Sequence, residues 1–300
     1  IFNRTVSANY GMSYSYSNVF ADAGMDNVMR WLPFDMPEGE LRNRIKNKMI
    51  RPTSIPFSPR ELMIEQAMCR EALRLSLEQH KLLATGLKGV QKASDISSMF
   101  AQNRGGQTLV DMTDLGMIIG SGGVLSHAPR RSQAALMMLD AFLPEGLTQL
   151  TVDSIFMMPQ LGVLAEVLPE AATQVFERDC LVYLGTSLAP VGPMRSGQKM
   201  CWGRLGSTDF ELRGGELKVL PLGMGEVAEL TCEVDKSLDL GAGPGQPLKR
   251  RVKGGGVGFI LDGRGRRPFV LPTSKAERVE KLTLWNKALN TYPDSLWEAS

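Results

Sequence analysis

A Gly-Ser-Gly-Gly turn at residues 120–123 is the first candidate for ligand binding, and it ends an apolar run within residues 109–119. Glycines leave backbone N–H groups accessible and let an adenine or a phosphate approach the main chain. At the carboxyl edge of a parallel sheet, such a turn is a common ligand position. The alternative is a tight strand-to-helix turn that needs only a positive φ. The spacing matches neither GxGxxG nor GxxxxGKS/T, which excludes the Rossmann and P-loop motifs.

Ser126 and His127 follow this turn directly and could contact a ligand bound over the glycines. The alternative is a helix N-cap before Pro129. No carboxylate stands at a fixed spacing from the two side chains, so a catalytic triad has no support, and we assign no catalytic residue. Asp111 and Asp114 are interpreted as loop carboxylates. An independent hydrolase using Ser126 and His127 would have to turn over substrate without added nucleotide.

Two basic clusters lie in the glycine-rich part of the chain. They could bind an acidic partner surface, a phosphate or RNA, and the alternative is a solvated hairpin face. Because aromatic residues are almost absent from the clusters, RNA binding has little support. We predict partner binding for the following residues: Lys249, Arg250, Arg251, Arg264, Arg266 and Arg267.

The composition excludes several classes of protein. The chain has 300 residues, 43% of them hydrophobic, and a net charge of +2. It is therefore a globular chain without overall attraction to DNA or to an anionic membrane. Its four cysteines are far apart, and neither CxxC nor HExxH occurs, which argues against a disulfide framework and a zinc site. No apolar run is long enough for a transmembrane helix, and we expect a cytoplasmic protein.

The segments around the turn predict strands that alternate with helices. Ser58 is the expected N-cap of a helix that begins at Pro59 and runs to about residue 80. The elements expected next are a strand within residues 109–119, a helix over 129–142, a strand over 149–154, a helix over 159–178 and a strand over 180–184. This order predicts an α/β fold with right-handed crossovers and a parallel sheet.

The two ends of the chain differ from this centre. The prolines before residue 59 favour strands, loops and turns over residues 1–57, and a loop is expected over residues 95–106. Beyond residue 203, short alternating segments separated by glycines predict a small β-barrel or sandwich. The expected parts are an α/β lobe over residues 1–195, a β-rich domain over 196–272 and a helical tail over 273–300, with a helix at 275–289.

Two strings resemble the glutamate mutase accessory protein family: DLGMIIGSGGVLSHAP at residues 114–129 and GGVGFILDGRGR at residues 255–266. This family is called MutL or GlmL and is unrelated to the mismatch-repair MutL. Shorter matches lie between the two strings at residues 152–153, 184–186, 189–192, 220–222 and 239–243. In order and spacing, the resemblance covers most of residues 60–272.

The resemblance implies the second lobe of an actin- or hexokinase-like ATPase fold, which clamps a nucleotide between two lobes. The residues implied to bind nucleotide are Gly120, Ser121, Gly122, Gly123, Val124 and His127. It further implies a reactivating chaperone for an adenosylcobalamin-dependent mutase, which uses ATP or ADP with Mg²⁺ to exchange damaged cofactor. The implied partners are the mutase subunits and the missing N-terminal lobe.

The sequence departs from this family in its phosphate loops, because no DxGxT-type motif and no second phosphate loop occurs in the 300 residues. Residues 4–6 resemble the segment just after the second loop, so we expect either a C-terminal part of a longer protein or a variant without hydrolysis. Phosphoryl transfer needs donors and a metal positioned on the γ-phosphate. Two hypotheses remain: a nucleotide-binding part of an accessory chaperone, or a non-catalytic interaction module whose glycine turn is structural.

Overall fold

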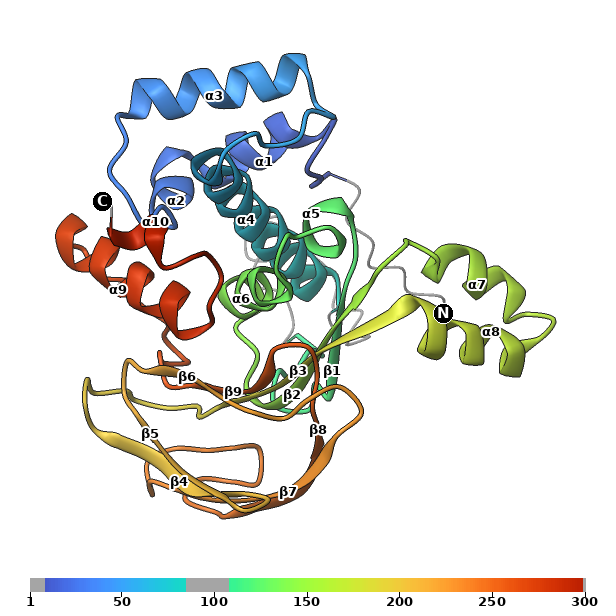
Figure 1. Cartoon of the computed structure of the whole chain (residues 1–300), viewed down its shortest axis with the longest axis vertical. Coiled ribbons are helices and arrows are strands. Elements are labelled where there is room, and N and C mark those ends of the chain that lie inside the picture. The colour runs from blue at the N-terminus through green and yellow to red at the C-terminus, as the bar shows by residue number, and fades with distance from the viewer. Residues whose placement is uncertain (1–8, 85–107, 299–300) are drawn as a thin grey trace, which may run out of the picture.

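The computed structural model describes residues 9–84 and 108–298, which form helices around two β-sheets (Figure 1). The five-stranded sheet has the order β1 (Met117–Gly120), β2 (Gly146–Asp153), β3 (Leu181–Ala189), β9 (Gly258–Asp262) and β6 (Leu217–Leu220). The four-stranded sheet has the order β5 (Thr208–Arg213), β4 (Lys199–Leu205), β7 (Val227–Val234) and β8 (Leu248–Lys253). The predicted mixture of helices and strands is confirmed, and it is arranged in two sheets.

The direction of the strands differs from the prediction after β2. Strands β1 and β2 are parallel, and α5 (Gly123–Ser126) and α6 (Arg131–Phe142) connect them. Strand β3, however, is antiparallel to β2, so the prediction of a parallel sheet is wrong there. The reason is that the segment between β2 and β3 projects from the sheet instead of crossing its face (Figure 1). Strand β3 therefore pairs directly with β2, the strand that precedes it in the chain.

The predicted single helix over residues 159–178 is also wrong, because the segment is divided. It forms α7 (Met158–Leu164), α8 (Pro169–Val175) and a short π-helix (Phe176–Cys180). Pro169 begins α8, and Leu168 before it has a non-helical backbone, with φ −132° and ψ 68°. A residue that precedes proline is disfavoured in the α conformation. The break between α7 and α8 is therefore caused by Pro169. The spacing of apolar residues, on which the prediction of one helix rested, does not include this effect.

Helices replace the strands and loops expected before residue 58. They are α1 (Tyr16–Ala23), α2 (Met25–Met29) and α3 (Glu38–Ile50). The β-forming residues Tyr16 and Val19 are buried in a helical core, where packing outweighs their intrinsic preference. The prolines fall between helices, so they limit helix length without preventing helices. The strand-forming residues 3–6 and the loop expected over residues 95–106 lie outside the described residues.

Helix α4 (Pro59–Leu83) confirms the prediction of a capped helix. The Glu61 N–H donates to the Ser58 hydroxyl at 3.2 Å, and Pro59 occupies the first turn, where it has no hydrogen bond to lose. The C-terminal helix is also confirmed, as α9 (Lys275–Ala288), and α10 (Ser295–Glu298) follows it. In the part of the chain that the structure describes, no helix has both the length and the apolar character needed to cross a bilayer.

The expected β-rich region contributes to both sheets. Strands β4, β5, β7 and β8 form the four-stranded sheet, whereas β6 and β9 from the same region belong to the five-stranded sheet. Strand β9 is buried on both faces, with Ile260 in one core and Phe259 and Leu261 in the other. Both cores therefore include side chains of β9.

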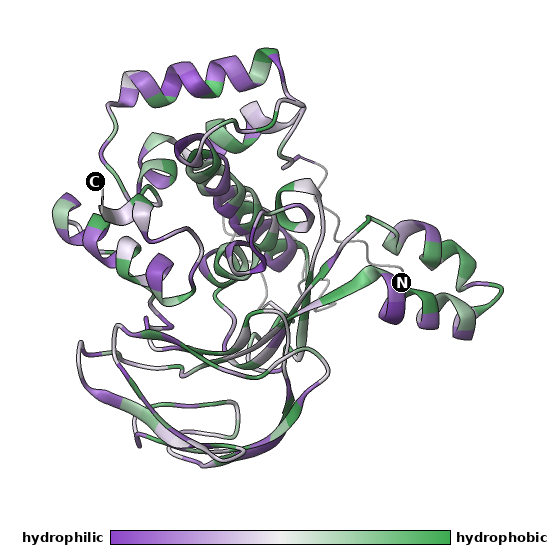
Figure 2. Cartoon of the chain, viewed as in Figure 1, coloured by the Kyte–Doolittle hydropathy of each residue, from purple (hydrophilic) through white to green (hydrophobic). Residues whose placement is uncertain are grey.

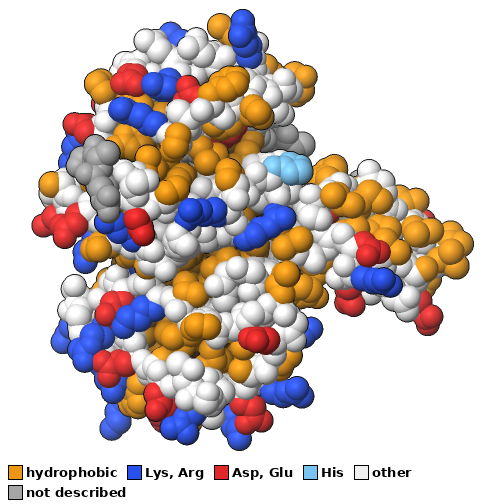
Figure 3. All heavy atoms as spheres, in the orientation of Figure 1, with side chains coloured by type: hydrophobic (Ala, Val, Ile, Leu, Met, Phe, Trp, Pro, Cys, Tyr) orange, Lys and Arg blue, Asp and Glu red, His pale blue; other side chains and the backbone are white. Residues whose placement is uncertain are grey.

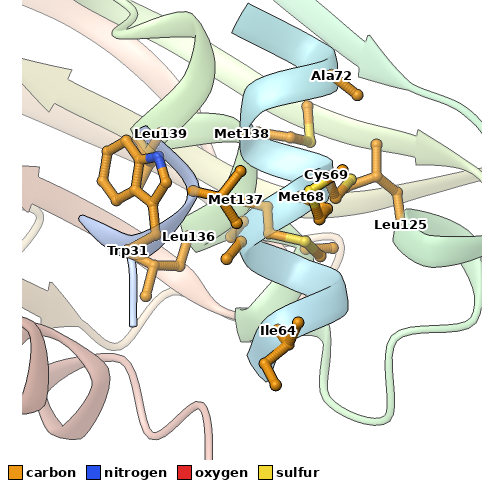
Figure 4. Close-up of a cluster of buried hydrophobic side chains, with 14 of the residues drawn as sticks. Trp31, Ile64, Met68, Cys69, Ala72, Leu125, Leu136, Met137, Met138 and Leu139 are labelled. Atoms are coloured by element: carbon orange, nitrogen blue, oxygen red, sulfur yellow. The ribbon is translucent and has the colours of Figure 1, made fainter. Parts of the chain in front are cut away.

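The larger core lies between the five-stranded sheet and the N-terminal helices. Helices α4 and α6 pack against each other there, and their buried side chains interdigitate in Figure 4. The labelled residues of α4 are Ile64, Met68, Cys69 and Ala72, and those of α6 are Leu136, Met137, Met138 and Leu139. Helix α3 lies at the outer side and is largely hydrophilic, with only Leu41 and Ile45 buried (Figure 2). The order from outside inward is thus α3, then α1 and α2, then α4, α6 and the sheet (Figure 1).

Charged side chains are buried where α4, α6 and the end of β9 meet. Arg70 Nε and Arg264 Nη1 each donate to one oxygen of Asp140, both at 2.6 Å. Arg264 Nη2 and Arg266 Nη2 both donate to Asp262 Oδ2 at 2.8 Å. None of these five residues is more than 6% exposed. Because an unpaired buried charge is strongly destabilising, the network fixes α4 and α6 relative to β9.

Asp140→Ala removes the carboxylate that two buried guanidinium groups share. We expect the free energy of unfolding to fall by about 3–5 kcal/mol, because Arg70 and part of Arg264 lose their counter-charge. Urea denaturation measures this change. The matched control is Asp209→Ala, which breaks an exposed pair with Arg204 and should leave the unfolding midpoint nearly unchanged. Equal effects of the two substitutions would contradict a structural role for the network.

The stability of the chain should also depend on acid pH through Asp262. Burial alone would raise the pKa of Asp262, but Arg264 and Arg266 outweigh it and hold this pKa well below its usual range. A carboxyl group with a lowered pKa stabilises the fold above its unfolded pKa, and this contribution is lost as the pH falls toward the folded pKa. We expect the free energy of unfolding to decline below about pH 4. Asp262→Asn should be less stable at neutral pH and show a shallower decline; parallel profiles would disprove the assignment.

Candidate functional site

A groove of about 1080 Å³ lies between the N-terminal helices and the turn at residues 120–123. One wall is a face of α4, and the facing wall is the turn with the start of the segment that follows it. The loop at residues 52–59 and the C-terminal residues 291–293 complete the rim. The groove-lining residues of α4 are Leu62, Glu65, Cys69, Ala72, Leu73 and Ser76. Ser121, Gly122 and Gly123 of the glycine turn thus line a large groove.

The turn joins β1 to a helix, as its sequence predicts, but the helix is the single turn α5 and not the one expected at Pro129. Gly122 has a φ of +102°, which residues with a side chain rarely adopt. At Gly120, an added Cβ would lie 2.9 Å from Leu125 Cδ1 and 3.0 Å from Met138 Sδ. The close packing at Gly120 and the positive φ at Gly122 therefore each require a glycine, whether or not a ligand binds. At Gly123 the φ is not positive and no described atom lies within 4 Å of the Cβ position, so the backbone there has open space beside it.

Ser121, Val124 and His127 also line the groove, as predicted for ligand-contacting residues. The Ser121 Oγ atom is buried and has no hydrogen-bond partner among the described residues. A buried hydroxyl without a partner costs free energy, which a bound polar group could recover. Val124 is half-buried against the larger core, and His127 is exposed at the end of α5. Five of the six residues predicted to bind nucleotide therefore line the groove, whereas Gly120 is buried and does not.

Ser126 differs from its neighbours because its side chain points away from the groove's open space. Its hydroxyl lies 2.9 Å from the Gly122 carbonyl oxygen and 3.0 Å from that of Asp153, and the residue is 6% exposed. It is the last residue of α5, so the interpretation as an N-cap before Pro129 is wrong. Ser126 ties the turn to β2, and a hydrolase that uses it as a nucleophile has no support from this geometry.

The wall formed by α4 combines apolar and polar groups. Lys48 Nζ donates to Glu65 Oε1 at 2.7 Å and also to the carbonyl oxygen of Ser54. This places one carboxylate and one ammonium beside the apolar surface of Leu62 and Ala72. Burial raises the pKa of the Cys69 thiol to about 12, so this cysteine stays protonated and is not a nucleophile at neutral pH. The arrangement suits a flat apolar group with polar edges better than covalent chemistry.

The predicted partner-binding residues do not form one surface. Lys249, Arg250 and Arg251 are exposed on β8, an edge strand of the four-stranded sheet. Arg264 and Arg266 are each 1% exposed and paired with buried aspartates, so the prediction that they contact a partner is wrong. For these two residues the alternative of a solvated hairpin face is also wrong, whereas the exposed Lys249, Arg250 and Arg251 are compatible with it. Arg267 is exposed, and its guanidinium group is paired with Glu145 at 2.6 Å.

No group of three or more His, Cys, Asp or Glu side chains within residues 9–84 and 108–298 is arranged to hold a metal ion. The groove therefore offers apolar surface, backbone groups and a few polar side chains. Sequence reasoning found the turn but missed the α4 wall. The only signal for that wall was the amphipathic pattern of the helix, which does not show where its exposed face points.

Comparisons with known proteins place the turn inside a recognised region. The chain matches the family model described as MutL protein over residues 1–180. It is 23% identical over 180 residues to Protein MutL of Clostridium tetanomorphum. This alignment covers 58% of the chain and 36% of that protein, so the chain spans about a third of the length of this curated relative. No solved structure matches the chain.

The turn can be tested by a matched pair of glycine substitutions. Gly120→Ala should lower the free energy of unfolding by about 1–3 kcal/mol, because its Cβ would meet Leu125, Met138 and Val152 at 2.9–3.3 Å. Gly123→Ala should have little effect on stability, because its Cβ would enter open space. Urea denaturation of both variants provides the measurement. If the two substitutions cost the same, the packing described for the turn is incorrect.

Proposed function

Because the chain belongs to the MutL protein family, we propose that it is the part of a glutamate mutase accessory protein that binds the adenosine end of a nucleotide. The groove between α4 and the turn at residues 120–123 is the proposed site. The observation that carries this proposal is the open backbone at Gly122 and Gly123 inside that groove. An adenine ring can lie there against the main chain, since no side chain separates the two.

The donor set of the groove fits adenosine. Adenine is flat and apolar on its faces and polar at its edges, which matches apolar walls with a few placed polar groups. Ser121 Oγ is buried without a partner and can bond to a ring nitrogen or amino group. On the facing wall, Glu65 and Ser76 line the groove and can bond to ribose hydroxyls. Both walls therefore contribute to one ligand.

The described residues do not supply an equivalent site for phosphates. The chain lacks a phosphate-loop motif, and the described residues contain no cluster of metal ligands. We infer that the ligands of the phosphates and of Mg²⁺ belong to the remainder of a MutL-type protein, as the second lobe of an actin-like ATPase would require. Mg²⁺ with ATP would supply charge neutralisation at the phosphates there. This chain would hold and orient the nucleoside.

The two-walled groove suggests how nucleotide could act on a mutase. Because the buried network holds α4 in place, a ligand in the groove would draw the rim at residues 52–59 and 291–293 toward itself and favour this closed arrangement. The rim would then move relative to α4 as nucleotide is exchanged. We propose that this movement serves the reactivating or chaperone role toward adenosylcobalamin-dependent mutase subunits. The alternative, an interaction module with a purely structural turn, predicts no nucleotide binding.

Calorimetric titration of the chain with adenosine, ADP and ATP tests the proposal. We expect micromolar to low-millimolar dissociation constants, and adenosine and ADP should agree within about tenfold because the phosphates gain few contacts. Gly122→Asp should weaken binding by at least about tenfold, since its side chain would occupy the adenine position. The matched control is Gly225→Asp, another positive-φ glycine with open space, at an exposed position outside the groove.

A second variant separates binding from backbone strain. Gly123→Leu adds a side chain to the groove at a position without positive φ, and it should also abolish binding while the chain stays folded. Thermal unfolding of each variant verifies the fold. Absence of heat with millimolar nucleotide, or equal binding by Gly122→Asp and Gly225→Asp, would refute the adenosine site and leave the interaction module.

A further inference from the structure

The helical hairpin of α7 and α8 exposes an unusual amount of apolar surface. It projects away from the rest of the chain in Figure 1, and hydrophobic side chains cover much of it in Figure 3. Val163 is 69% exposed and Val167 is 77% exposed, whereas only Leu161 and Ala172 of the two helices are buried. The other exposed hydrophobic residues of this segment are Ile155, Phe156, Leu164, Leu168 and Val175. Contiguous apolar surface of this kind marks an interaction site.

A hollow of about 350 Å³ lies between this hairpin and the sheet. Met117 and Ile119 of β1 line it from the sheet, and Leu161 and Ala165 line it from α7. Strand β1 ends the five-stranded sheet, with β2 as its paired neighbour among the described residues. At 3.6 residues per turn, Leu161 and Ala165 lie on the opposite side of α7 from Val163. The hollow is therefore separate from the exposed apolar surface that includes Val163.

Acidic side chains predominate on the hairpin and on the turn that follows it. No Lys or Arg occurs from residue 132 to residue 177. Glu166, Glu170 and Glu177 are exposed on the hairpin and on the turn that follows it. Beyond them, Arg178 lies beside Asp179 at 3.8 Å, so their charges largely cancel. The face is therefore apolar at its centre and acidic at its edge.

We propose that the exposed side of the α7–α8 hairpin binds a helix of a partner protein whose apolar side chains are flanked by Lys or Arg. The apolar stripe of such a helix covers Val163 and Val167. Its cations meet Glu166 and Glu170, which directs the orientation of the helix. The acidic edge disfavours both an anionic lipid surface and a second copy of the same hairpin, because each would bring like charges together.

The test uses the full chain and a labelled synthetic helix of 18 residues, with a leucine stripe flanked by lysines. The matched probe has glutamate at every lysine position. Fluorescence anisotropy should show that the lysine helix binds at least about tenfold more tightly than the glutamate helix. The double variant Val163→Ser/Val167→Ser should weaken binding of the lysine helix by about tenfold or more. The control, Met224→Ser/Val227→Ser, removes two exposed apolar residues elsewhere and should bind like the unaltered chain.

Charge reversal provides a second readout that does not depend on apolar contact. Glu166→Lys/Glu170→Lys should invert the preference between the two probes, since both residues are exposed and the fold does not rely on them. Equal binding of both probes, or equal loss in the hairpin and control variants, would overturn the proposal. Binding of phosphatidylglycerol vesicles through Val163 and Val167, or a dimer that the double variant dissociates, would overturn it as well. None of these measurements uses a nucleotide, so the result for the hairpin does not depend on whether the adenosine site exists.

Discussion

The shared carboxylate of Asp140 is the interaction on which the arrangement of this molecule depends. It accepts hydrogen bonds from Arg70 on α4 and from Arg264 just after β9, and it lies on α6 itself. The guanidinium group of Arg264 also lies 4.9 Å from the ring centroid of Trp285, which brings α9 into the same network. Because a buried charge without its partner is costly, these elements can be assembled in few other ways. One network thereby positions the α4 wall of the groove and the strand that both cores share.

The groove and the hairpin relate to this network differently. Helix α4 carries Arg70 on one face and groove-lining residues such as Glu65 and Ser76 on another, so a ligand in the groove acts on an element that is fixed from behind. The α7–α8 hairpin has no residue in the network, and it contributes few side chains to the cores. A rigid binding groove and a projecting, apolar hairpin can therefore serve different partners. This division agrees with the proposal of a nucleotide-dependent accessory protein that docks onto another protein.

The sequence predicted one half of the candidate site. The Gly-Ser-Gly-Gly turn was identified because glycines at the end of an apolar run are a local signal, and its position between a strand and a helix is confirmed. The other half, on α4, lies about fifty residues away in the chain, and only packing brings it opposite the turn. The interpretation of Arg264 and Arg266 as surface residues was wrong for the same reason. Asp262 was visible beside them, but Asp140 is 124 residues from Arg264 in the sequence.

Four features could be recognised from the amino-acid sequence alone: the capped start of α4, the turn at residues 120–123, the C-terminal helix and membership in the MutL family. These follow from hydrogen bonds and backbone preferences that extend over a few positions. Three features became clear only from the fold: the helices within residues 16–50, the antiparallel return of β3 and the burial of Arg264 and Arg266. Each of these depends on which distant surface covers a segment, because burial free energy outweighs local preferences that differ by about 1 kcal/mol.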